Sequence, residues 1–212
     1  MKIDILTAMS LNGIISPHRG TSSLELINKL NVPKEVLELQ YNLRKEYDAI
    51  MLGTGAVLID NPTLNSHNLE EAIRITIDPF ERIPKNYHFL DGSIRTIIGV
   101  SNQTSGKYLS FLENNNIEYI IAGEKRVESP LFYDKLTKEK NISSILVEGG
   151  GNFNYNLLKE NLIDNLQVIV MPVLLDSSSV NLFDSNKNIF NKMCLEDIKK
   201  IDDYLFIKYK IK

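Results

Sequence analysis

A carboxylate and a glycine-rich turn lie next to each other in the chain, where Glu148 precedes the glycines from Gly149 to Gly151 and Asn152. The apolar run 145–147 before them is typical of a buried strand, and the residues after them favour a helix. Such a turn leaves backbone N–H groups unpaired, and without Cβ atoms an anion can approach them closely. We therefore expect a phosphate-containing ligand here. The alternative is a ligand-free turn, but a plain turn needs one glycine and each further one costs roughly 1 kcal/mol.

Glu148 ends the strand that leads into these glycines. Its carboxylate is either solvated at the rim of the sheet or points into a crevice, as a hydrogen-bond acceptor or proton carrier. A buried carboxyl group must be paired or protonated, so Glu148 is a candidate general acid.

Two other apolar runs end in similar residues, at Gly53-Thr54-Gly55 and at Gly99-Val100-Ser101. In mostly parallel sheets, ligands collect at the carboxyl ends of the strands. Asp60 either ends a helical turn or is a crevice carboxylate, and Asn12 either belongs to an ordinary turn or faces the same end of the sheet. Arg74 and Arg82 are expected at the surface rather than at a phosphate.

The elements that must position these residues alternate along the chain. Apolar and β-branched runs predict strands at 3–9, 48–53, 74–78, 96–100, 117–122, 145–147 and 166–171, and a hairpin of 195–201 with 204–211. Helices are predicted at 33–46, 108–114, 129–140, with Ser129 as the N-cap, and from the glycines to about 160. Residues 53–60 are predicted to be a glycine-containing strand exit into a short helical turn. Residues 172–184 read as a long connection. This order predicts an α/β fold with a mostly parallel sheet and an antiparallel C-terminal hairpin.

Composition narrows the possible functions. The chain has 212 residues, 43% of them hydrophobic, a net charge of −3, one cysteine and three histidines. We expect one domain over 1–212, with no disulfide framework, no metal site and no nucleic-acid surface. There is no signal-peptide pattern and no apolar run near the ~20 residues that span a bilayer. We expect a cytoplasmic protein that does not bind membranes.

Taken together, several stretches resemble the reductase domain of riboflavin biosynthesis, the RibD C-terminal domain, which has a dihydrofolate-reductase-like three-layer fold. They occur in the family's order over roughly residues 3–183. The matching pieces are Ala8-Met-Ser-Leu-Asn-Gly13, Leu43-Arg44, Asp48-Ala-Ile-Met-Leu-Gly53, Val57-Leu-Ile-Asp-Asn-Pro-Thr-Leu64, Arg74-Ile-Thr-Ile-Asp78, Arg82-Ile-Pro84, Ile145-Leu-Val-Glu-Gly-Gly-Gly151, Leu162-Ile-Asp164 and Met171-Pro-Val-Leu-Leu175.

The resemblance implies an NADPH-dependent reductase that reduces the ribosyl group of a ribosylamino-pyrimidine 5′-phosphate to ribityl, with hydride delivered to C1′. Glu148 is then expected to handle the proton. The implied cofactor-binding residues are Gly53, Thr54, Ala56, Val57, Asp60, Ser101, Gly149, Gly150, Gly151 and Asn152. The implied substrate-binding residues are Asn12, Asp60, Asn61, Leu64, His67 and Glu148. The resemblance also implies a homodimer.

The chain departs from the family pattern mainly in its substrate half. Asn12 replaces an Asp, Ile14 a Lys and Ala56 a Thr, and 65–67 reads Asn-Ser-His where the family has Thr-x-Arg. Loss of a bidentate arginine from a phosphate site is a large change. Two alternatives therefore stay open: a related NAD(P)H-dependent reductase of another carbonyl or imine, and a non-catalytic nucleotide-binding relative.

Overall fold

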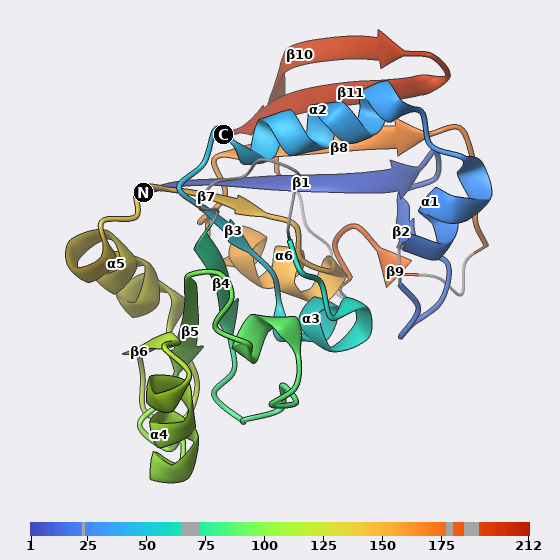
Figure 1. Ribbon diagram of the computed structural model, residues 1–212. Helices are drawn as coiled ribbons and strands as arrows, with labels where there is room; N and C mark the ends of the chain where they lie inside the picture. Colours follow the sequence, from blue (N-terminus) through green and yellow to red (C-terminus); the bar gives the residue numbers. More distant parts are fainter. Residues whose placement is uncertain (23, 65–72, 177–179, 185–190) are drawn as a thin grey trace. The chain divides into compact units, whose positions relative to one another are not determined.

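The chain divides into two compact units. In this computed structural model the described residues are 1–22, 24–64, 73–176, 180–184 and 191–212. The middle unit comprises residues 44–145 with Met1, and the terminal unit comprises residues 2–43 and 146–212. Figure 1 labels the helices and strands of both.

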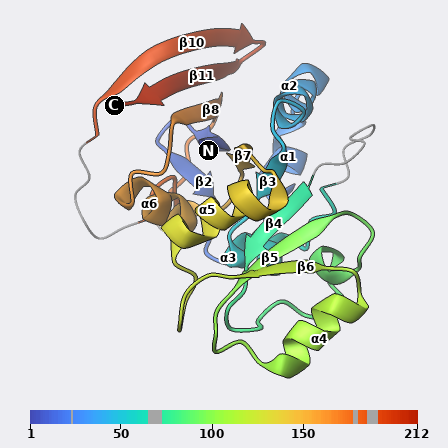
Figure 2. The same ribbon diagram turned by 90° about the vertical axis from the view of Figure 1, so that its left-hand side faces the viewer.

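The middle unit is built on parallel strands in the order β3-β4-β5-β6, which lie side by side in Figure 2. Helices connect them, and α4 and α5 both contact β6. The elements are β3 (Ala49–Met51), α3 (Thr54–Asp60), β4 (Ile73–Ile77), the short 3-10 helix η1 (His88–Leu90), β5 (Thr96–Val100), α4 (Gly106–Asn114), β6 (Glu118–Ile121) and α5 (Ser129–Lys140).

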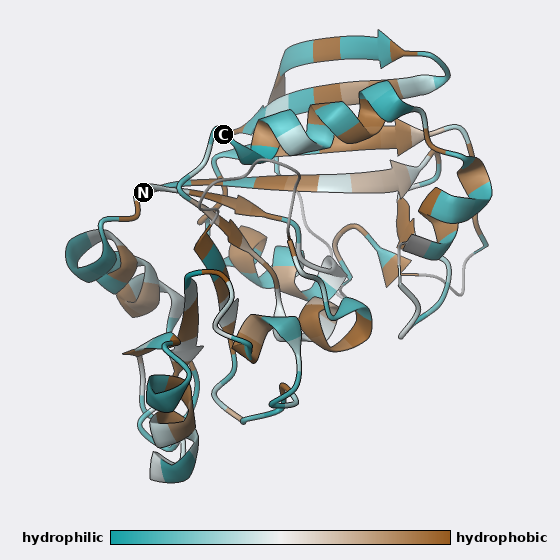
Figure 3. Ribbon diagram, viewed as in Figure 1, coloured by the Kyte–Doolittle hydropathy of each residue, from teal (hydrophilic) through white to brown (hydrophobic). Residues whose placement is uncertain are grey.

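Strand β5 shows why the strands of this sheet are continuous apolar runs. All of its residues are buried, and the strands of this unit are mostly brown in the hydropathy colouring of Figure 3. A parallel strand covered on both faces needs apolar residues at successive positions. Helix α5 packs closely on it, because a Cβ at Gly99 would lie only 2.9 Å from the ring of Phe132.

The terminal unit combines parallel and antiparallel pairing. Strands β1 and β8 are parallel, β11 is antiparallel to β8, and β10 forms a hairpin with β11 at the edge. Figure 1 shows α2 in front of the β8–β11 part of this sheet. The elements are β1 (Lys2–Ser10), β2 (Ile14–Ser16), α1 (Leu24–Leu30), α2 (Lys34–Arg44), β7 (Ser144–Val147), α6 (Gly151–Lys159), β8 (Asn165–Met171), β9 (Val180–Asn181), β10 (Met193–Ile201) and β11 (Tyr204–Ile211).

A buried polar cluster fixes the register of β1 on β8. Asp4 is fully buried and lies opposite Asn165 in the ladder. Its carboxylate accepts hydrogen bonds from Asn165 Nδ2 at 2.9 Å and Gln167 Nε2 at 3.4 Å. A one-residue slip would move these polar groups to the other face of the sheet.

The predicted α/β class, parallel strands and C-terminal hairpin are confirmed. Some local expectations are wrong. A helix at Leu24–Leu30 was not predicted, and the connection 172–184 contains β9, which pairs with β2. The N-cap of α5 is Glu128 rather than Ser129, which is the first helical residue.

Candidate functional site

The glycine turn of the terminal unit exposes the start of a helix. Gly150 is the N-cap of α6, with φ 63° and ψ 145°, and no side chain caps the helix. Within the described residues, the structure records no acceptor for the N–H groups of Gly151, Asn152 and Phe153. A Cβ at Gly150 would meet nothing within 4 Å. These free donors and the positive end of the helix dipole fit a phosphate group.

At two of the three positions the structure itself requires a glycine. Gly150 has a positive φ that side chains rarely adopt. Gly151 is in close contact with a neighbouring segment: a Cβ there would collide with the carbonyl oxygen of Asn181 and lie 2.8 Å from Asp184 Cβ. The expectation that a plain turn here needs only one glycine is therefore wrong. The prediction of a phosphate-containing ligand rests on the free N–H groups rather than on the number of glycines.

The segment 180–184, which we call the strap, is tied to the start of α6. Asp184 N donates to Gly151 O at 3.1 Å, and Asn154 Nδ2 donates to Leu182 O at 3.2 Å. The two terminal nitrogens of Arg19, Nη1 and Nη2, donate to the Asp184 carboxylate at 2.7 and 2.9 Å. Hydrogen bonding to Asp184 raises the pKa of Arg19. The strap thus holds the first turn of α6 in place from one side.

Glu148 follows β7 and is half-buried. Gln40 of α2 donates from Nε2 to Glu148 Oε2 at 3.4 Å. The structure therefore gives this carboxylate a neighbour that orients it while leaving part of it accessible. Its proton-carrying role stays a prediction, and it rests on position rather than on complete burial.

The amide of Asn12 binds the main chain of Leu175. Its Nδ2 donates to Leu175 O at 2.7 Å, and its Oδ1 accepts from Leu175 N at 3.2 Å and from Ser10 Oγ at 2.8 Å. An aspartate could not donate the first of these hydrogen bonds. The asparagine in place of the family's aspartate thus has a structural explanation, and its substrate contact stays a prediction.

In the middle unit, the exit of β3 forms a different turn. Gly53 is the N-cap of α3 with an ordinary extended φ of −66°. The buried hydroxyl of Thr54 donates to Ile77 O at the end of β4, and the Val57 side chain is fully buried. Ala56 is half-buried. In this turn, Thr54 and Val57 thus serve the packing of the unit, and their cofactor contacts stay a prediction.

The residues after α3 adopt an unusual backbone. Asn61 caps the helix in the left-handed region with φ 39°, and Leu64 is buried with φ 53°. The Oδ1 atom of Asn61 accepts a hydrogen bond from His88 N at 2.9 Å. Asp60 is half-buried at the last position of the helix. His67 lies outside the described residues.

Arg74 was expected at the surface, and the structure shows that this expectation is wrong. It is fully buried, and its guanidinium binds Thr96 Oγ1 at 3.0 Å and Asp91 Oδ1 at 3.2 Å. The buried side chain of Ser101 lies after β5, where its N–H donates to Thr104 Oγ1 at 3.1 Å. The Arg74 arrangement requires no ligand, whereas the buried Oγ of Ser101 has no hydrogen-bond partner among the described residues.

The predicted site residues divide between the two units. The terminal unit holds Asn12 and the stretch from Glu148 to Asn152, and the middle unit holds Ser101 and the described residues between Gly53 and Leu64. Sequence reasoning missed Gln40, the strap and the Arg74 network. Among the described residues no three or more His, Cys, Asp or Glu side chains are grouped to hold a metal ion, and no helix is long and apolar enough to cross a membrane.

Relatives share both the sequence pattern and the fold. A 2,5-diamino-6-ribosylamino-4(3H)-pyrimidinone 5′-phosphate reductase of Methanothermobacter thermautotrophicus is 31% identical over 172 residues, covering 79% of this chain and 76% of the relative. The whole chain matches the solved structure of Acinetobacter baumannii RibD with a TM-score of 0.80 and 18% identity, over 58% of that protein. It matches the riboflavin biosynthesis reductase Rib7 of Saccharomyces cerevisiae with a TM-score of 0.70 and 22% identity, over 90% of that protein.

These likenesses confirm the dihydrofolate-reductase-like fold that the sequence predicted. The model of the RibD C-terminal domain family matches residues 2–205, which is nearly the whole chain. The protein therefore belongs to the RibD C-terminal domain family.

Proposed function

We propose that this protein is an NADPH-dependent reductase that converts the ribosyl group of 2,5-diamino-6-ribosylamino-4(3H)-pyrimidinone 5′-phosphate, or its 5-amino counterpart, to ribityl. The names of the relatives support the substrate. The observation that carries the proposal is the uncapped start of α6, whose free N–H groups suit a dinucleotide's diphosphate.

The predicted contacts to NADPH are assigned residue by residue. Residues 149–152 bind the diphosphate through backbone N–H groups. The turn from Gly53 to Val57 contacts the nicotinamide half, Asp60 lies against a sugar hydroxyl, and Ser101 faces the adenosine ribose. When bound, the cofactor supplies the hydride, and the residues of the chain supply position and proton transfer.

Glu148 is the proposed proton donor of the reaction. As the C1′–O4′ bond of the ribosylamine breaks, its electron pair goes to O4′, which takes the proton from the Glu148 carboxyl. The nitrogen lone pair forms a C1′=N bond, and hydride addition at C1′ completes the ribityl chain. Gln40, which donates to Oε2, keeps the carboxyl oriented. Asn12, Asn61, Leu64 and His67 remain the predicted substrate contacts.

The test is the oxidation of NADPH, followed by absorbance, with the ribosylamino-pyrimidine phosphate as substrate and dihydrofolate as control. We expect turnover with the first alone. Glu148→Gln should lower turnover by about 10²-fold or more while NADPH affinity changes only a few-fold. Equal turnover of Glu148→Gln and the wild type would remove Glu148 from the mechanism.

The departures at Asn12, Ile14 and 65–67 favour a second candidate, a related reductase of another carbonyl or imine. It predicts NADPH oxidation with other sugar amines but not with the ribosylamino-pyrimidine phosphate. Binding of NADPH without turnover on any such substrate would instead indicate a non-catalytic relative.

We further propose a cytoplasmic homodimer whose chains each form one domain over 1–212. The edge strand β10 supports the dimer, because Met193, Leu195 and Ile198 on it are 40, 55 and 55% exposed. In an antiparallel pair of β10 strands centred on Ile198, Asp197 would lie opposite Lys199 of the second copy. Light scattering should give twice the chain mass of 24.1 kDa, and Ile198→Glu should halve it. A wild-type mass near one chain would contradict the dimer.

A further inference from the structure

Arg74 in the middle unit is a fully buried cation whose nitrogens are all bonded. Nε donates to Thr96 Oγ1 at 3.0 Å, Nη2 to Asp91 Oδ1 at 3.2 Å and to Ile94 O at 3.3 Å, and Nη1 to Thr63 O at 3.4 Å. With no exposed surface and no nitrogen left over, this guanidinium is unsuited to bind a phosphate itself. It can act only through the groups that it holds.

Asp91 connects Arg74 to the neighbouring 3-10 helix. Its Oδ1 also accepts from Ser93 N at 2.8 Å and Ser93 Oγ at 2.6 Å, and its Oδ2 lies 3.3 Å from His88 Nδ1. Burial alone would raise the pKa of Asp91, but hydrogen bonds from Ser93 and Arg74 outweigh it and lower the pKa to about 2. The pair is therefore ionised at neutral pH and joins β4 to η1.

The same network holds the segment 61–64 at two points. His88 N donates to Asn61 Oδ1 at 2.9 Å, and Arg74 Nη1 donates to Thr63 O. Between and beyond these points the chain is constrained, because Asn61 and Leu64 have positive φ angles and Leu64 is buried. A backbone of this kind persists only where its surroundings hold it.

We propose that Arg74 and Asp91 are positioning residues that fix the segment 61–64 in the conformation that contacts the substrate. This rests on the proposed function, which assigns substrate contacts to Asn61 and Leu64. The arrangement also gives a reason for a fully buried arginine whose partner, Asp91, is 34% exposed. Removal of the Asp91 carboxylate leaves the buried guanidinium without its counter-charge, and removal of the guanidinium leaves Thr63 O without this donor, so either change releases the segment.

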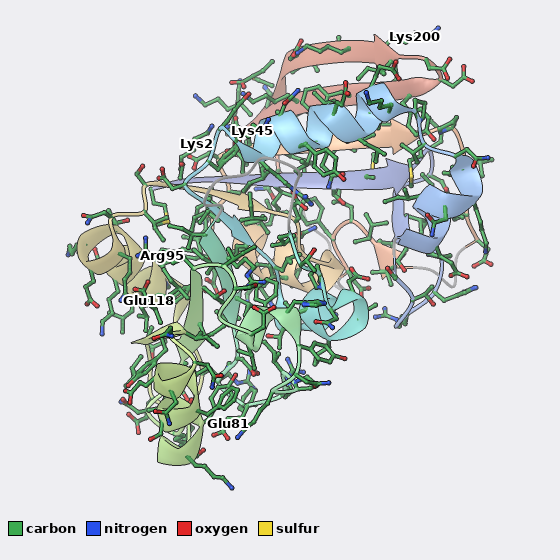
Figure 4. All side chains as sticks on the ribbon, in the orientation of Figure 1. Lys2, Lys45, Glu81, Arg95, Glu118 and Lys200 are labelled. Carbon is green, nitrogen blue, oxygen red and sulfur yellow. The ribbon has the colours of Figure 1, made fainter. Side chains whose placement is uncertain are left out.

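The test compares Arg74→Lys and Asp91→Asn with Arg95→Lys. Arg95 lies in the same unit and pairs with Glu118 at 2.7 Å, but that pair is at the surface, as Figure 4 shows. Amide hydrogen exchange in the segment 61–64, which is followed at Asn61, Thr63 and Leu64 because Pro62 has no N–H, reports the anchoring directly, without substrate. Steady-state kinetics report its consequence, and thermal melting identifies a variant that has not folded.

We expect at least tenfold faster exchange at 61–64 in Arg74→Lys and Asp91→Asn, together with a KM for the phosphorylated substrate raised about tenfold and an NADPH Kd within about twofold. Arg95→Lys should change none of these. If Arg74→Lys does not fold, the proposal is tested by Asp91→Asn, in which the side chain keeps its size and shape. Unchanged exchange at 61–64 in a folded variant overturns the proposal, and so does faster exchange with unchanged KM. Wild-type protein that oxidises no NADPH would instead overturn the proposed function. The exchange result would still report whether Arg74 and Asp91 anchor the segment 61–64.

Discussion

The two units contain strand-to-helix turns that look alike in sequence and differ in structure. In the terminal unit, Gly150 has a positive φ and leaves the first N–H groups of α6 free, while Gly151 is in close contact with the strap. In the middle unit, Gly53 has an ordinary extended backbone and Thr54 is bonded to β4. Glycine after a strand is therefore a weak sign of an anion site. Free N–H groups at the start of the helix are a stronger one.

The largest expected effect comes from Gly150→Val. A β-branched residue is strained at a φ of 63° and places its side chain beside the free N–H groups. Loss of one or two charge-assisted hydrogen bonds, at about 1.5 kcal/mol each, should weaken NADPH binding by about 10²-fold. Fluorescence titration measures this. Gly106→Ala at the start of α4, which also has open space around it, is the control and should leave the affinity unchanged. Equal affinities of all three proteins would abolish the distinction between the two turns.

Gly151→Ala should act on stability. Its Cβ would overlap Asn181 O and crowd Asp184, so the strap or α6 must shift. We expect a loss of about 2 kcal/mol in the free energy of unfolding, in the range for overpacked sites. Urea denaturation measures it. A loss below about 0.5 kcal/mol would mean that the strap yields easily and that the third glycine is free to serve a ligand alone.

The two units also differ in the burial of the arginine in their arginine–aspartate pairs. Arg19 is 65% exposed in its pair with Asp184, whereas Arg74 is fully buried in its pair with Asp91. Since the folded pKa of Asp91, about 2, is below the ~3.9 of an unfolded chain, its contribution to stability is complete above pH about 4 and is lost as pH falls through about 2.

Asp91→Asn should therefore be less stable than the wild type by about 1 kcal/mol at pH 7, since solvent screens this partly exposed carboxylate, and the difference should shrink between pH about 4 and 2. Denaturation at a series of pH values measures it. Asp184→Asn, whose partner Arg19 is exposed although Asp184 itself is only 13% exposed, should show a difference of at most about 1 kcal/mol. A pH-independent difference for Asp91→Asn would contradict the ionised pair.

The smallest effect is expected for Gly55→Ala in α3. This glycine has open space around it and no positive φ, so alanine should stabilise the helix by about 0.5 kcal/mol. Thermal melting measures the shift. Destabilisation would show that the turn of the middle unit depends on its glycines as the turn of the terminal unit does.

Sequence patterns predicted most of the fold because its strands are short apolar runs with clear stops. Strand β5 and the end of α5 were predicted to the residue, and the hairpin around Asp202 and Asp203 was predicted within two. The helix Leu24–Leu30 was not predicted because its seven residues show little periodicity. Strand β9 was not predicted because two residues carry no alternating pattern. Elements this short depend on contacts that are remote in sequence.

The site was predicted less completely, for reasons visible at particular residues. Arg74 lies within the apolar run Ile73–Ile77, and a parallel strand covered on both faces must bury such a residue and pair it. The apolar neighbours on both sides of Arg74 thus indicate its burial. The contact of Gly151 with Asn181 links residues thirty positions apart, and the partner of Asn12 is 163 positions away. No local pattern indicates such contacts.

The central claim is that the N–H groups at the start of α6 bind the diphosphate of NADPH. The most direct measurement is an NMR titration of ¹⁵N-labelled protein with NADPH, with the amide signals of Gly151, Asn152 and Phe153 assigned. We predict that these three signals move with a common dissociation constant that matches the fluorescence titration. Saturation with NADPH that leaves all three signals in place would contradict the claim.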